Sequence, residues 1–277
     1  MSNNKTIQEL LNFSIINIDK SAGPTSFGVD VIVKKALGLS KTSHFGTLDP
    51  QVTGVLPIAL GRACRLSDYF MHKNKKYVGI MRVHQEISRE KLEQELEKFI
   101  GKIMQLPPVK SRVKREIRER EVFSFKILEQ DGKDFLFETE VQAGTYIRKL
   151  ISDLGERIGG AHMLELRRTQ AGIFSEENIV NLYEFEKAIN DWKNGSDGKL
   201  RKILIPAEEA LKKILPSVQI DEKLIKQLLT GKPLFKSDKI NLPKEEKFAV
   251  FCQDRFIGIY KKVDEGNIIA RAEFVFN

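Results

Sequence analysis

The sequence predicts an α+β protein with a smaller, mostly β unit at its C-terminal end. Helix and strand patterns occur along the chain without the strict β-α-β alternation that indicates a parallel sheet. Residues 122–129 and 135–141 alternate apolar and polar side chains around DGKD, as the two strands of a hairpin do. Three β-rich runs, KFAVFC, RFIGIYKKV and IIARAEFVF, end the chain. We therefore place two domains at residues 1–200 and 204–277.

The first hundred residues show strand and helix patterns in turn. Strands are expected at residues 14–19 (SIINID) and 77–83. Ser26 is placed to cap a helix that ends before Gly38. Ser88 is placed to cap a second helix, whose apolar side chains form a stripe at helical spacing.

A third helix is expected after the hairpin, with Thr145 placed to cap it and Gly159 following its end. Residues 191–202, DWKNGSDGKLRK, are polar and rich in turn formers. This composition makes them the expected linker between the domains. Two short helices, near residues 207–215 and 221–229, are expected before the C-terminal strands.

Composition places the chain among ordinary folded proteins, because 41% of its residues are apolar and 30% are charged. No apolar run is long enough to cross a bilayer, and the first residues, MSNNKTIQELLNF, lack a signal-peptide pattern. We therefore expect a cytoplasmic protein. The two cysteines and four histidines show no metal-ligand spacing, so no metal site is predicted.

The chain carries a net charge of +8, from 46 basic and 38 acidic residues. This excess fits a polyanionic partner such as a nucleic acid, with a generally basic surface as the alternative. Residues 204–277 contain 13 basic and 11 acidic residues, so most of the excess lies in the larger N-terminal part.

One loop contains the residue that we expect to react. In HFGTLDPQVTGVLPIALG (residues 44–61), Asp49 lies in a turn that runs directly into an apolar segment. An aspartate in a turn usually stabilises only its own backbone. Here the residues that follow are expected to be buried, so the turn is held against a core. A short acidic side chain on a rigid loop can present a reactive carboxylate.

Several segments, in a fixed order, resemble one protein family. They are INIDKSAGPTS (16–26), SHFGTLDPQVTGVLPIALGRACRL (43–66), KKYVGIMRV (75–83), AGTYIRKLISDLG (143–155) and GAHMLELRRTQAG (160–172). The chain resembles the TruB-type RNA pseudouridine synthases. The stretches TIQELLNFSIINIDKSAGPTS, MRVHQEIS and PPVKSRVKR are similar to the archaeal and dyskerin-like branch. The resemblance implies a catalytic domain with a mixed, largely antiparallel sheet. The C-terminal unit is more weakly similar to a PUA domain, which is small and β-barrel-like.

Three positions depart from the family pattern. Ser43 stands where a glycine usually precedes the histidine, and Ser21 stands where a proline usually follows the lysine. Phe27 stands where a histidine often follows Thr-Ser. None of these changes removes a charged group from the expected site. The C-terminal unit and the N-terminal extension are also shorter than in the family.

The resemblance implies an isomerase that converts uridine in RNA into pseudouridine. The N-glycosidic bond breaks, the uracil turns over, and its C5 joins the ribose. Because the reaction is an isomerisation, it needs no redox cofactor, ATP or metal. The carboxylate either attacks the sugar or base covalently, or removes a sugar proton to give a glycal. The sequence does not choose between these routes.

By the same resemblance, three residues carry catalysis. Asp49 is the reactive carboxylate, Arg148 is the cation that grips it, and Tyr77 stacks on the uracil or moves a proton at C5. From pattern alone, Arg148 would be a solvated residue in the first turn of a helix. Tyr77 would be an aromatic side chain packed on a sheet. The resemblance favours the catalytic roles.

Further residues are expected to bind the substrate. His44 would lie beside the extruded nucleotide, and Leu166 would add an apolar wall. Lys20 would support the site or meet a phosphate, and Gly46 and Thr47 belong to the same motif as His44. The alternatives are a structural histidine, a core leucine and a solvated lysine. A basic run, which either contacts RNA or is simply solvated, comprises Lys110, Arg112, Lys114, Arg115, Arg118 and Arg120.

Two modes of action fit the resemblance. The enzyme modifies position 55 in the T-loop of tRNA by itself, or it is the catalytic subunit of an archaeal H/ACA guide-RNA particle that acts on rRNA. In the particle, its partners would be a small zinc-ribbon protein, a β-barrel protein and a kink-turn-binding protein. Two other classes stay open, a non-catalytic RNA-binding scaffold and an aspartate-dependent hydrolase that releases uracil.

Overall fold

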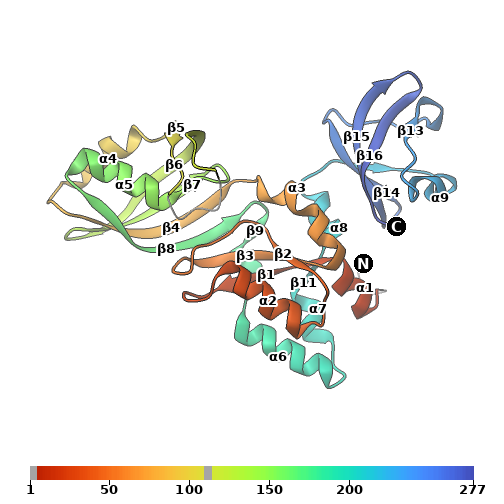
Figure 1. Ribbon diagram of the computed structural model, residues 1–277, viewed down its shortest axis with the longest axis horizontal. Coiled ribbons are helices and arrows are strands. Elements are labelled where there is room, and N and C mark those ends of the chain that lie inside the picture. Colours follow the sequence, from red (N-terminus) through yellow and green to blue (C-terminus); the bar gives the residue numbers. More distant parts are fainter. Residues whose placement is uncertain (1–4, 109–113) are drawn as a thin grey trace. The chain divides into compact units, whose positions relative to one another are not determined.

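The computed structural model describes residues 5–108 and 114–277. The chain divides into two compact units, Lys5–Leu204 and Ile205–Asn277 (Figure 1). Each unit buries an apolar core of its own. The first unit therefore holds every residue that the sequence predicts to take part in catalysis.

A mixed, largely antiparallel sheet forms the first unit, as the family resemblance implies. Its main strands follow the order β10-β1-β3-β8-β4-β7-β6-β5, and in this order only β10–β1 and β3–β8 are parallel pairs. The strands are β1 (Ser14–Lys20), β2 (Thr42–His44), β3 (Thr53–Leu60), β4 (Lys75–Val83), β5 (Gly101–Gln105), β6 (Arg118–Asp131), β7 (Asp134–Val141), β8 (Ala161–Ala171), β9 (Phe174–Ser175) and β10 (Val180–Asn181).

Amphipathic helices cover this sheet. In Figure 1, α4 and α5 lie over the strands β4 to β8, whereas α2 and α6 lie along β1 and β3. Leu92 of α4 and Leu150 of α5 are fully buried in the same core as Phe137 of β7. The helices are α1 (Ile7–Asn12), α2 (Ser26–Ala36), α3 (Ser67–Met71), α4 (Arg89–Glu97), α5 (Ile147–Ile158), α6 (Leu182–Lys193) and α7 (Gly198–Ile203), with the 3₁₀ helices η1 (Gly61–Leu66) and η2 (Glu176–Asn178).

A short parallel junction connects the two parts of the sheet. Here β3 and β8 pair only through Thr53 with Arg167 and Gly54 with Arg168. Gly54 has a φ of +101°, and a Cβ at this position would lie 2.2 Å from the carbonyl oxygen of Arg168. Only glycine allows this close approach of the two backbones. The junction thus brings the loop before β3 next to β8, which also pairs with β4.

Two helix caps differ from those that the sequence predicts. Thr25, not Ser26, caps α2, because its side chain accepts a hydrogen bond of 2.9 Å from the backbone N–H of Gly28. The helix α5 begins at Ile147 without a side-chain cap, and among the described residues the hydroxyl of Thr145 has no hydrogen-bond partner. Both misplaced caps lie next to loops of the candidate site, where tertiary contacts replace local capping.

The expected linker at residues 191–202 is wrong. This segment contains the end of α6 and most of α7, and Leu200 of α7 is fully buried in the core of the first unit. The polar composition wrongly predicts a linker, because α7 buries a single side chain, Leu200, and its other side chains are polar or partly exposed. The chain passes between its two units at residues 204–205 instead.

The second unit is built on a five-stranded sheet with the order β12-β14-β15-β16-β13. The three β-rich runs of the sequence form β14, β15 and β16, as predicted. Tyr260 is buried at their centre, and burial raises the pKa of its hydroxyl. The elements in this part of the chain are β11 (Leu204–Pro206), α8 (Ala207–Lys212), β12 (Ser217–Gln219), η3 (Glu222–Leu224), α9 (Ile225–Leu228), β13 (Leu234–Phe235), η4 (Lys236–Asp238), β14 (Lys247–Cys252), β15 (Arg255–Glu265) and β16 (Ile268–Val275).

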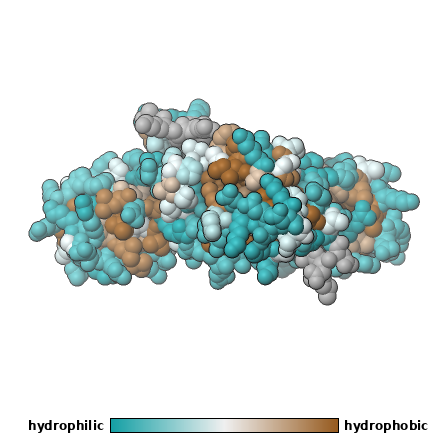
Figure 2. Space-filling model, turned by 90° about the horizontal axis from the view of Figure 1, so that it is seen from below, coloured by the Kyte–Doolittle hydropathy of each residue, from teal (hydrophilic) through white to brown (hydrophobic). Residues whose placement is uncertain are grey.

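Hydrophilic side chains cover much of the face shown in Figure 2, with smaller apolar areas between them. Across residues 5–108 and 114–277, none of the helices combines the length and the hydropathy that a membrane span requires.

Candidate active site

Asp49 and Arg148 meet although 99 residues separate them in the sequence. A nitrogen (Nη2) of the Arg148 guanidinium lies 2.6 Å from a carboxylate oxygen (Oδ2) of Asp49. Arg148 lies in the first turn of α5, and Asp49 lies in the loop before β3. The Asp49 side chain is 48% exposed and that of Arg148 is 59% exposed. The expected pair is therefore present, but it lies on an open surface rather than in a closed cavity.

Lys20 supports the loop of Asp49 from inside the protein. Its side chain is fully buried, and its ammonium group donates hydrogen bonds to the carbonyl oxygens of Ser21, Pro50 and Val52 at 2.8–2.9 Å. Burial lowers the pKa of Lys20, and the nearby Asp49 carboxylate raises it. Three donors thus meet three acceptors. Lys20 is not placed to touch a phosphate, so we assign it to positioning instead of substrate binding.

Ser26 fixes the residue before Asp49. Its buried hydroxyl donates to the carbonyl oxygen of Leu48 at 2.9 Å and accepts from the N–H of Leu48 at 2.8 Å. Leu48 is itself buried in the core, with 3% of its surface exposed. The main chain on the N-terminal side of Asp49 is therefore tied to α2, which explains why Ser26 leaves the capping role to Thr25.

Arg168 is a site residue that the sequence analysis did not identify. Its buried guanidinium donates to the carbonyl oxygens of Val55, at 2.8 Å, and Gly46, at 2.9 Å. Tyr77 is the residue opposite Arg168 across the β4–β8 pairing. Burial lowers the pKa of Arg168, and Tyr77 opposes that change. Arg168 thus links Tyr77 to the loop of Asp49.

The alternation of side chains along β8 could have predicted the burial of Arg168. Leu166 and Arg168 are two positions apart, so they share one face of the strand, and both are buried. Arg167 points to the other face, where it binds the carboxylate of Asp19 at 2.9 and 3.1 Å and that of Glu176 at 2.6 Å. A site residue predicted at Leu166 therefore implicates Arg168 and not Arg167.

Tyr77 and Leu166 are buried side chains at the β4–β8 pairing. Both side chains are 8% exposed. Gly79 lies opposite Leu166, and a Cβ at Gly79 would lie 3.0 Å from a methyl carbon of Leu166. This placement agrees with the expected wall and stacking ring, and it agrees equally with the alternative of packed core residues.

His44 is held on both sides. Its Nδ1 lies 2.6 Å from a carboxylate oxygen of Asp30 on α2, and its Nε2 lies 3.0 Å from the hydroxyl of Thr47. Thr47 is exposed, and Gly46 between these residues accepts the hydrogen bond from Arg168. His44, Gly46 and Thr47 therefore lie together in the loop that leads to Asp49. Asp30 is a further residue that the sequence analysis missed, because nothing in its local pattern links it to a histidine 14 positions away.

Gln105 orients the segment that carries Arg148. From the end of β5, its side-chain oxygen accepts from the N–H of Tyr146 at 3.0 Å, and its amide donates to the carbonyl of Tyr146 at 3.3 Å. Gln105 is buried, so this pair of bonds is shielded from water. The contact fixes Tyr146, the residue directly before α5.

Phe27, at the position where the family often has a histidine, is 65% exposed in the first turn of α2. It directly follows Ser26, the residue bonded to Leu48. An aromatic ring is thus presented to solvent close to the loop of Asp49.

The basic run is only partly described. Lys110 and Arg112 lie outside the described residues. Lys114 and Arg118 pair with Glu116, at 2.9 and 3.3 Å, and Arg120 donates to the carbonyl of Glu119 at 2.8 Å. Lys114 and Arg115 are exposed. In the described part, some basic side chains are thus paired with glutamates and others are exposed to solvent.

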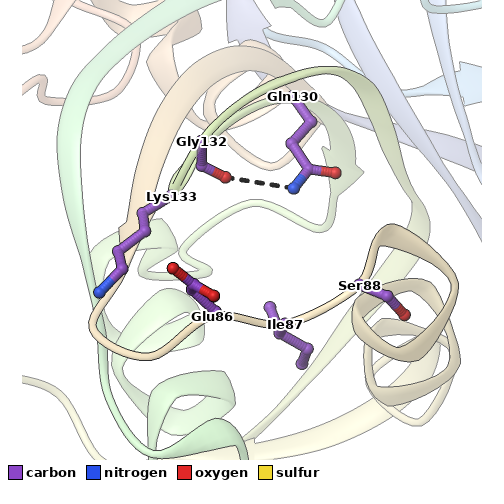
Figure 3. A pocket seen from close by; sticks show the side chains of 6 residues that line it. All are labelled: Glu86, Ile87, Ser88, Gln130, Gly132 and Lys133. Carbon is purple, nitrogen blue, oxygen red and sulfur yellow. Dashed lines mark hydrogen bonds between the residues drawn. The ribbon is translucent and has the colours of Figure 1, made fainter.

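Two cavities of the protein lie away from Asp49. One cavity of about 410 Å³ in the first unit lies between Glu86–Ser88 on one side and Gln130, Gly132 and Lys133 of the β6–β7 turn on the other (Figure 3). A second cavity of about 680 Å³ lies in the C-terminal unit. Neither is lined by a predicted site residue. Within the described parts of the chain, no three His, Cys, Asp or Glu side chains gather into a metal-binding group.

The arrangement combines a half-exposed carboxylate held by a guanidinium with a loop that Arg168 ties to β8, the strand paired with β4 at Tyr77. Buried cations and hydrogen bonds fix the loop from behind, so the carboxylate is presented in a defined place. Such a group can act on a substrate that arrives from the surface, as a base or as a nucleophile.

Family models match most of the first unit. One described as TruB family pseudouridylate synthase (N terminal domain) matches residues 34–147. Another, described as tRNA pseudouridylate synthase B C-terminal domain, matches residues 148–212. The "Probable tRNA pseudouridine synthase B" of Methanopyrus kandleri is 46% identical over 229 residues, which cover 82% of this chain and 68% of that protein.

The chain belongs to the TruB family of pseudouridine synthases.

Several relatives of this TruB-family chain are archaeal proteins. A protein of the same description from Nanoarchaeum equitans is 46% identical over 211 residues, or 76% of this chain, which spans 60% of that relative. A solved Cbf5-Nop10-Gar1 complex contains a chain that matches 99% of this one and is itself covered to 88%, with a TM-score of 0.89 and 36% identity. An H/ACA RNP bound to a substrate RNA contains a similar chain, with a TM-score of 0.88 and 34% identity.

Proposed function

We propose that this protein isomerises uridine to pseudouridine in RNA, with Asp49 as the reactive carboxylate. The observation that carries the proposal is the 2.6 Å contact between Asp49 and Arg148, two residues from segments typical of the family. Its membership of the TruB family gives this contact its chemical meaning, because a surface ion pair by itself has little significance.

The exposure of the pair suits a macromolecular substrate. An RNA that covers the site would remove Asp49 and Arg148 from water, and the attraction between them would then strengthen. The target uridine must leave its stack to reach the carboxylate, which costs a few kcal/mol. The exposed ring of Phe27 and the exposed hydroxyl of Thr47 are available to contact nucleotides near it.

Each residue has a role in the proposed reaction. Asp49 attacks the sugar or base, or removes a sugar proton, and Arg148 holds and aims its carboxylate. Tyr77, which lies opposite Arg168 across the β4–β8 pairing, faces the uracil. Lys20 and Ser26 fix the loop without touching the substrate. Both routes, covalent and glycal, stay compatible with this arrangement.

Replacing Asp49 by asparagine tests the proposal. The substitution keeps the size of the side chain and removes its charge, so Asp49→Asn should bind RNA as the wild type does and form no pseudouridine. The matched control is Asp134→Asn, because Asp134 also pairs with an arginine at the surface, at 2.6 Å, but far along β7 from the site. Turnover near that of the wild type in Asp49→Asn would refute the assignment.

We further propose that the enzyme works as the catalytic subunit of an H/ACA guide-RNA particle and on the tRNA T-loop. The similarity to chains of Cbf5 complexes over 99% of this chain supports the first mode. The archaeal relatives described as tRNA pseudouridine synthases support the second mode. In the particle, proteins similar to Nop10 and Gar1 would be its partners. A cytoplasmic location stays a prediction from the sequence.

The C-terminal unit is proposed to be a PUA-like RNA-binding domain. Its five-stranded sheet and small size support this assignment. Its cavity is lined by Lys236, Lys239 and Asn241, and these side chains can contact phosphates and bases.

One experiment separates the modes. The purified chain is incubated with a tRNA transcript or an rRNA fragment, with and without guide RNA and the partner proteins. Pseudouridine is then mapped by carbodiimide modification and primer extension. Modification of the tRNA without guide RNA supports action alone, and modification of rRNA only with guide RNA supports the particle.

The same samples address the other classes of function. A non-catalytic scaffold would bind RNA in every sample and modify none. An aspartate-dependent hydrolase would release free uracil, which chromatography detects. Neither class explains why Asp49, Arg148 and Tyr77 all occur together, because a scaffold needs none of them and a hydrolase need not retain the base.

A further inference from the structure

Asp30 is buried next to the candidate site, and catalysis as proposed above does not use it. Its side chain is 9% exposed, and its Oδ2 lies 2.6 Å from Nδ1 of His44. Among the described residues, its other oxygen, Oδ1, has no hydrogen-bond partner although it is buried. A buried carboxylate with only one partner normally costs stability, so its retention needs an explanation other than packing.

The contact with Asp30 determines where the proton of His44 lies. A carboxylate accepts hydrogen bonds and donates none, so Nδ1 must carry the proton in this pair. In a neutral ring, Nε2 is then unprotonated and accepts the hydrogen bond from the hydroxyl of Thr47, 3.0 Å away. Without an acceptor at Nδ1, the ring would be free to move its proton to Nε2 and to reverse the bond with Thr47.

The direction of the bond between His44 and Thr47 affects the loop that presents Asp49. Thr47 lies two residues before Asp49, and Leu48 between them is clamped by Ser26. Asp30 and Ser26 lie one helical turn apart on α2, so one face of this helix holds the loop at both points. When Thr47 donates to His44, the lone pairs of its exposed oxygen are left to accept from a substrate.

We propose that Asp30 is a positioning residue, which acts through His44 and Thr47 to set the geometry of the loop that carries Asp49. This inference rests on the proposed function for its kinetic part and on the geometry of the free protein for its spectroscopic part. It assigns Asp30 no contact with the substrate.

Among the described residues, His44 is the ionisable side chain that contacts the Asp30 carboxylate. Two other groups near it are uncharged. The backbone carbonyl of Asp30 accepts from the hydroxyl of Thr42 at 3.2 Å, which involves no charge. The thiol of Cys64 is close enough for the carboxylate to help raise its pKa, although burial is the larger cause, and that pKa is about 11. Cys64 is therefore a neutral thiol at ordinary pH, and Lys41 acts on it in the opposite direction.

Two substitutions separate positioning from packing. Asp30→Val removes the acceptor and keeps the shape, and it should lower kcat roughly ten- to a hundredfold, as loss of a carboxylate that orients a histidine does elsewhere. Asp30→Asn keeps an acceptor oxygen and should retain most of the activity. Because Oδ1 is buried without a partner among the described residues, Asp30→Val should be as stable as the wild type or more so. A carboxylate that serves only the fold would show the reverse, a loss of stability with kcat unchanged.

A double-mutant cycle tests whether Asp30 acts through His44. In a His44→Ala background, Asp30→Val should change kcat by no more than about twofold, the usual error of such cycles. If the full loss of activity appears in both backgrounds, Asp30 acts by another route and the proposal is overturned.

The spectroscopic test needs no RNA and no activity. ¹⁵N NMR of the free wild-type protein should show His44 with a protonated Nδ1 and an unprotonated Nε2 when the ring is neutral. The signal is assigned by its loss in His44→Ala. A neutral ring protonated at Nε2 would overturn the proposal whatever the kinetic results of the Asp30 variants. Conversely, absence of pseudouridine formation by the wild type would refute the proposed function and leave this spectroscopic result standing.

Discussion

Two buried lysines near the site differ in the number of hydrogen bonds that their side-chain nitrogens donate. Lys20 donates to three carbonyl oxygens, which matches the three protons of an ammonium group. Lys75, at the start of β4, is also buried and donates to two carbonyl oxygens, those of Met71 and Lys73. A neutral amine has two protons, so Lys75 can keep both bonds without its charge. Burial and the nearby Arg168 lower the pKa of Lys75 to about 8.

Lys75 should make stability depend on pH in a predictable direction. Its pKa is about 8 in the folded protein and near 10.5 in the unfolded chain, so between these values the unfolded chain binds more protons. Raising the pH from 8 to 9 should therefore stabilise the wild type relative to Lys75→Met by up to about 1.4 kcal/mol. Denaturant unfolding of both proteins at each pH measures this difference. A difference that does not change with pH would contradict the assignment.

The guanidinium of Arg148 should not be replaceable by an ammonium group. Arg148→Lys keeps the charge but loses the planar group that fixes the direction of Asp49, and we expect kcat to fall roughly a hundredfold. Stability should hardly change, because exposed ion pairs contribute little. Single-turnover kinetics on RNA measure the effect. Arg157→Lys, on the same helix but paired with Glu95, should behave as the wild type, and equal behaviour of the two variants would argue against the role of Arg148.

At the scale of single residues, the sequence points to the side chains proposed to react more readily than to those that position them. Asp49, Arg148 and Tyr77 lie in motifs that the family resemblance identifies. Arg168 and Gln105 act through contacts with backbone groups that are distant in sequence, so their residue types alone give little indication of the role. The alternation along β8 is the one local pattern that points to Arg168.

At the scale of elements, the site depends on the short parallel junction between β3 and β8. This pairing covers two residues on each strand, yet it places the loop of Asp49 beside Arg168 and Leu166. The strands themselves are predictable from apolar patterns and from the hairpin turn. The pairing is not, because two residues as far apart in the sequence as Gly54 and Arg168 leave no trace of their contact in either local pattern.

Gly54→Ala should disrupt this junction. The new Cβ would lie 2.2 Å from the carbonyl oxygen of Arg168, and the left-handed backbone conformation adds strain. We expect a loss of more than about 3 kcal/mol in the free energy of unfolding. Gly101→Ala is the matched control, because Gly101 has a similar φ of +94° with open space around its Cβ. It should lose about 1–2 kcal/mol from backbone strain alone. Equal losses in thermal or denaturant unfolding would show that the close approach is not essential.

The incorrect helix caps have a common cause at this scale. Sequence rules place a capping Ser or Thr from local spacing, which offers Thr25 and Ser26 at α2 and Thr145 at α5. Tertiary contacts decided the outcome, since Ser26 is used to hold Leu48 and Gln105 holds Tyr146. Exact helix ends therefore depend on neighbours that the local sequence does not contain.

At the scale of the whole molecule, charge should govern the affinity for RNA. The chain has a net charge of +8, and most of this excess lies before residue 204. RNA binding by the inactive Asp49→Asn protein should therefore weaken steeply with salt, by roughly a thousandfold between 50 and 200 mM if about six phosphates are contacted. Fluorescence anisotropy with labelled tRNA measures the slope. An affinity independent of salt would argue against an electrostatic RNA interface.

The sequence by itself determined the fold class and the family and indicated which residues are expected to react, because these are recorded in local patterns and in motifs that keep their order along the chain. The tertiary structure alone decided where the first unit ends, how α2 and α5 begin, and which buried residues hold the loop of Asp49. These features arise from contacts between residues far apart in the sequence, such as Arg168 with Gly46 and Asp30 with His44. Such contacts are selected by the packing of the whole chain, so no single segment can specify them.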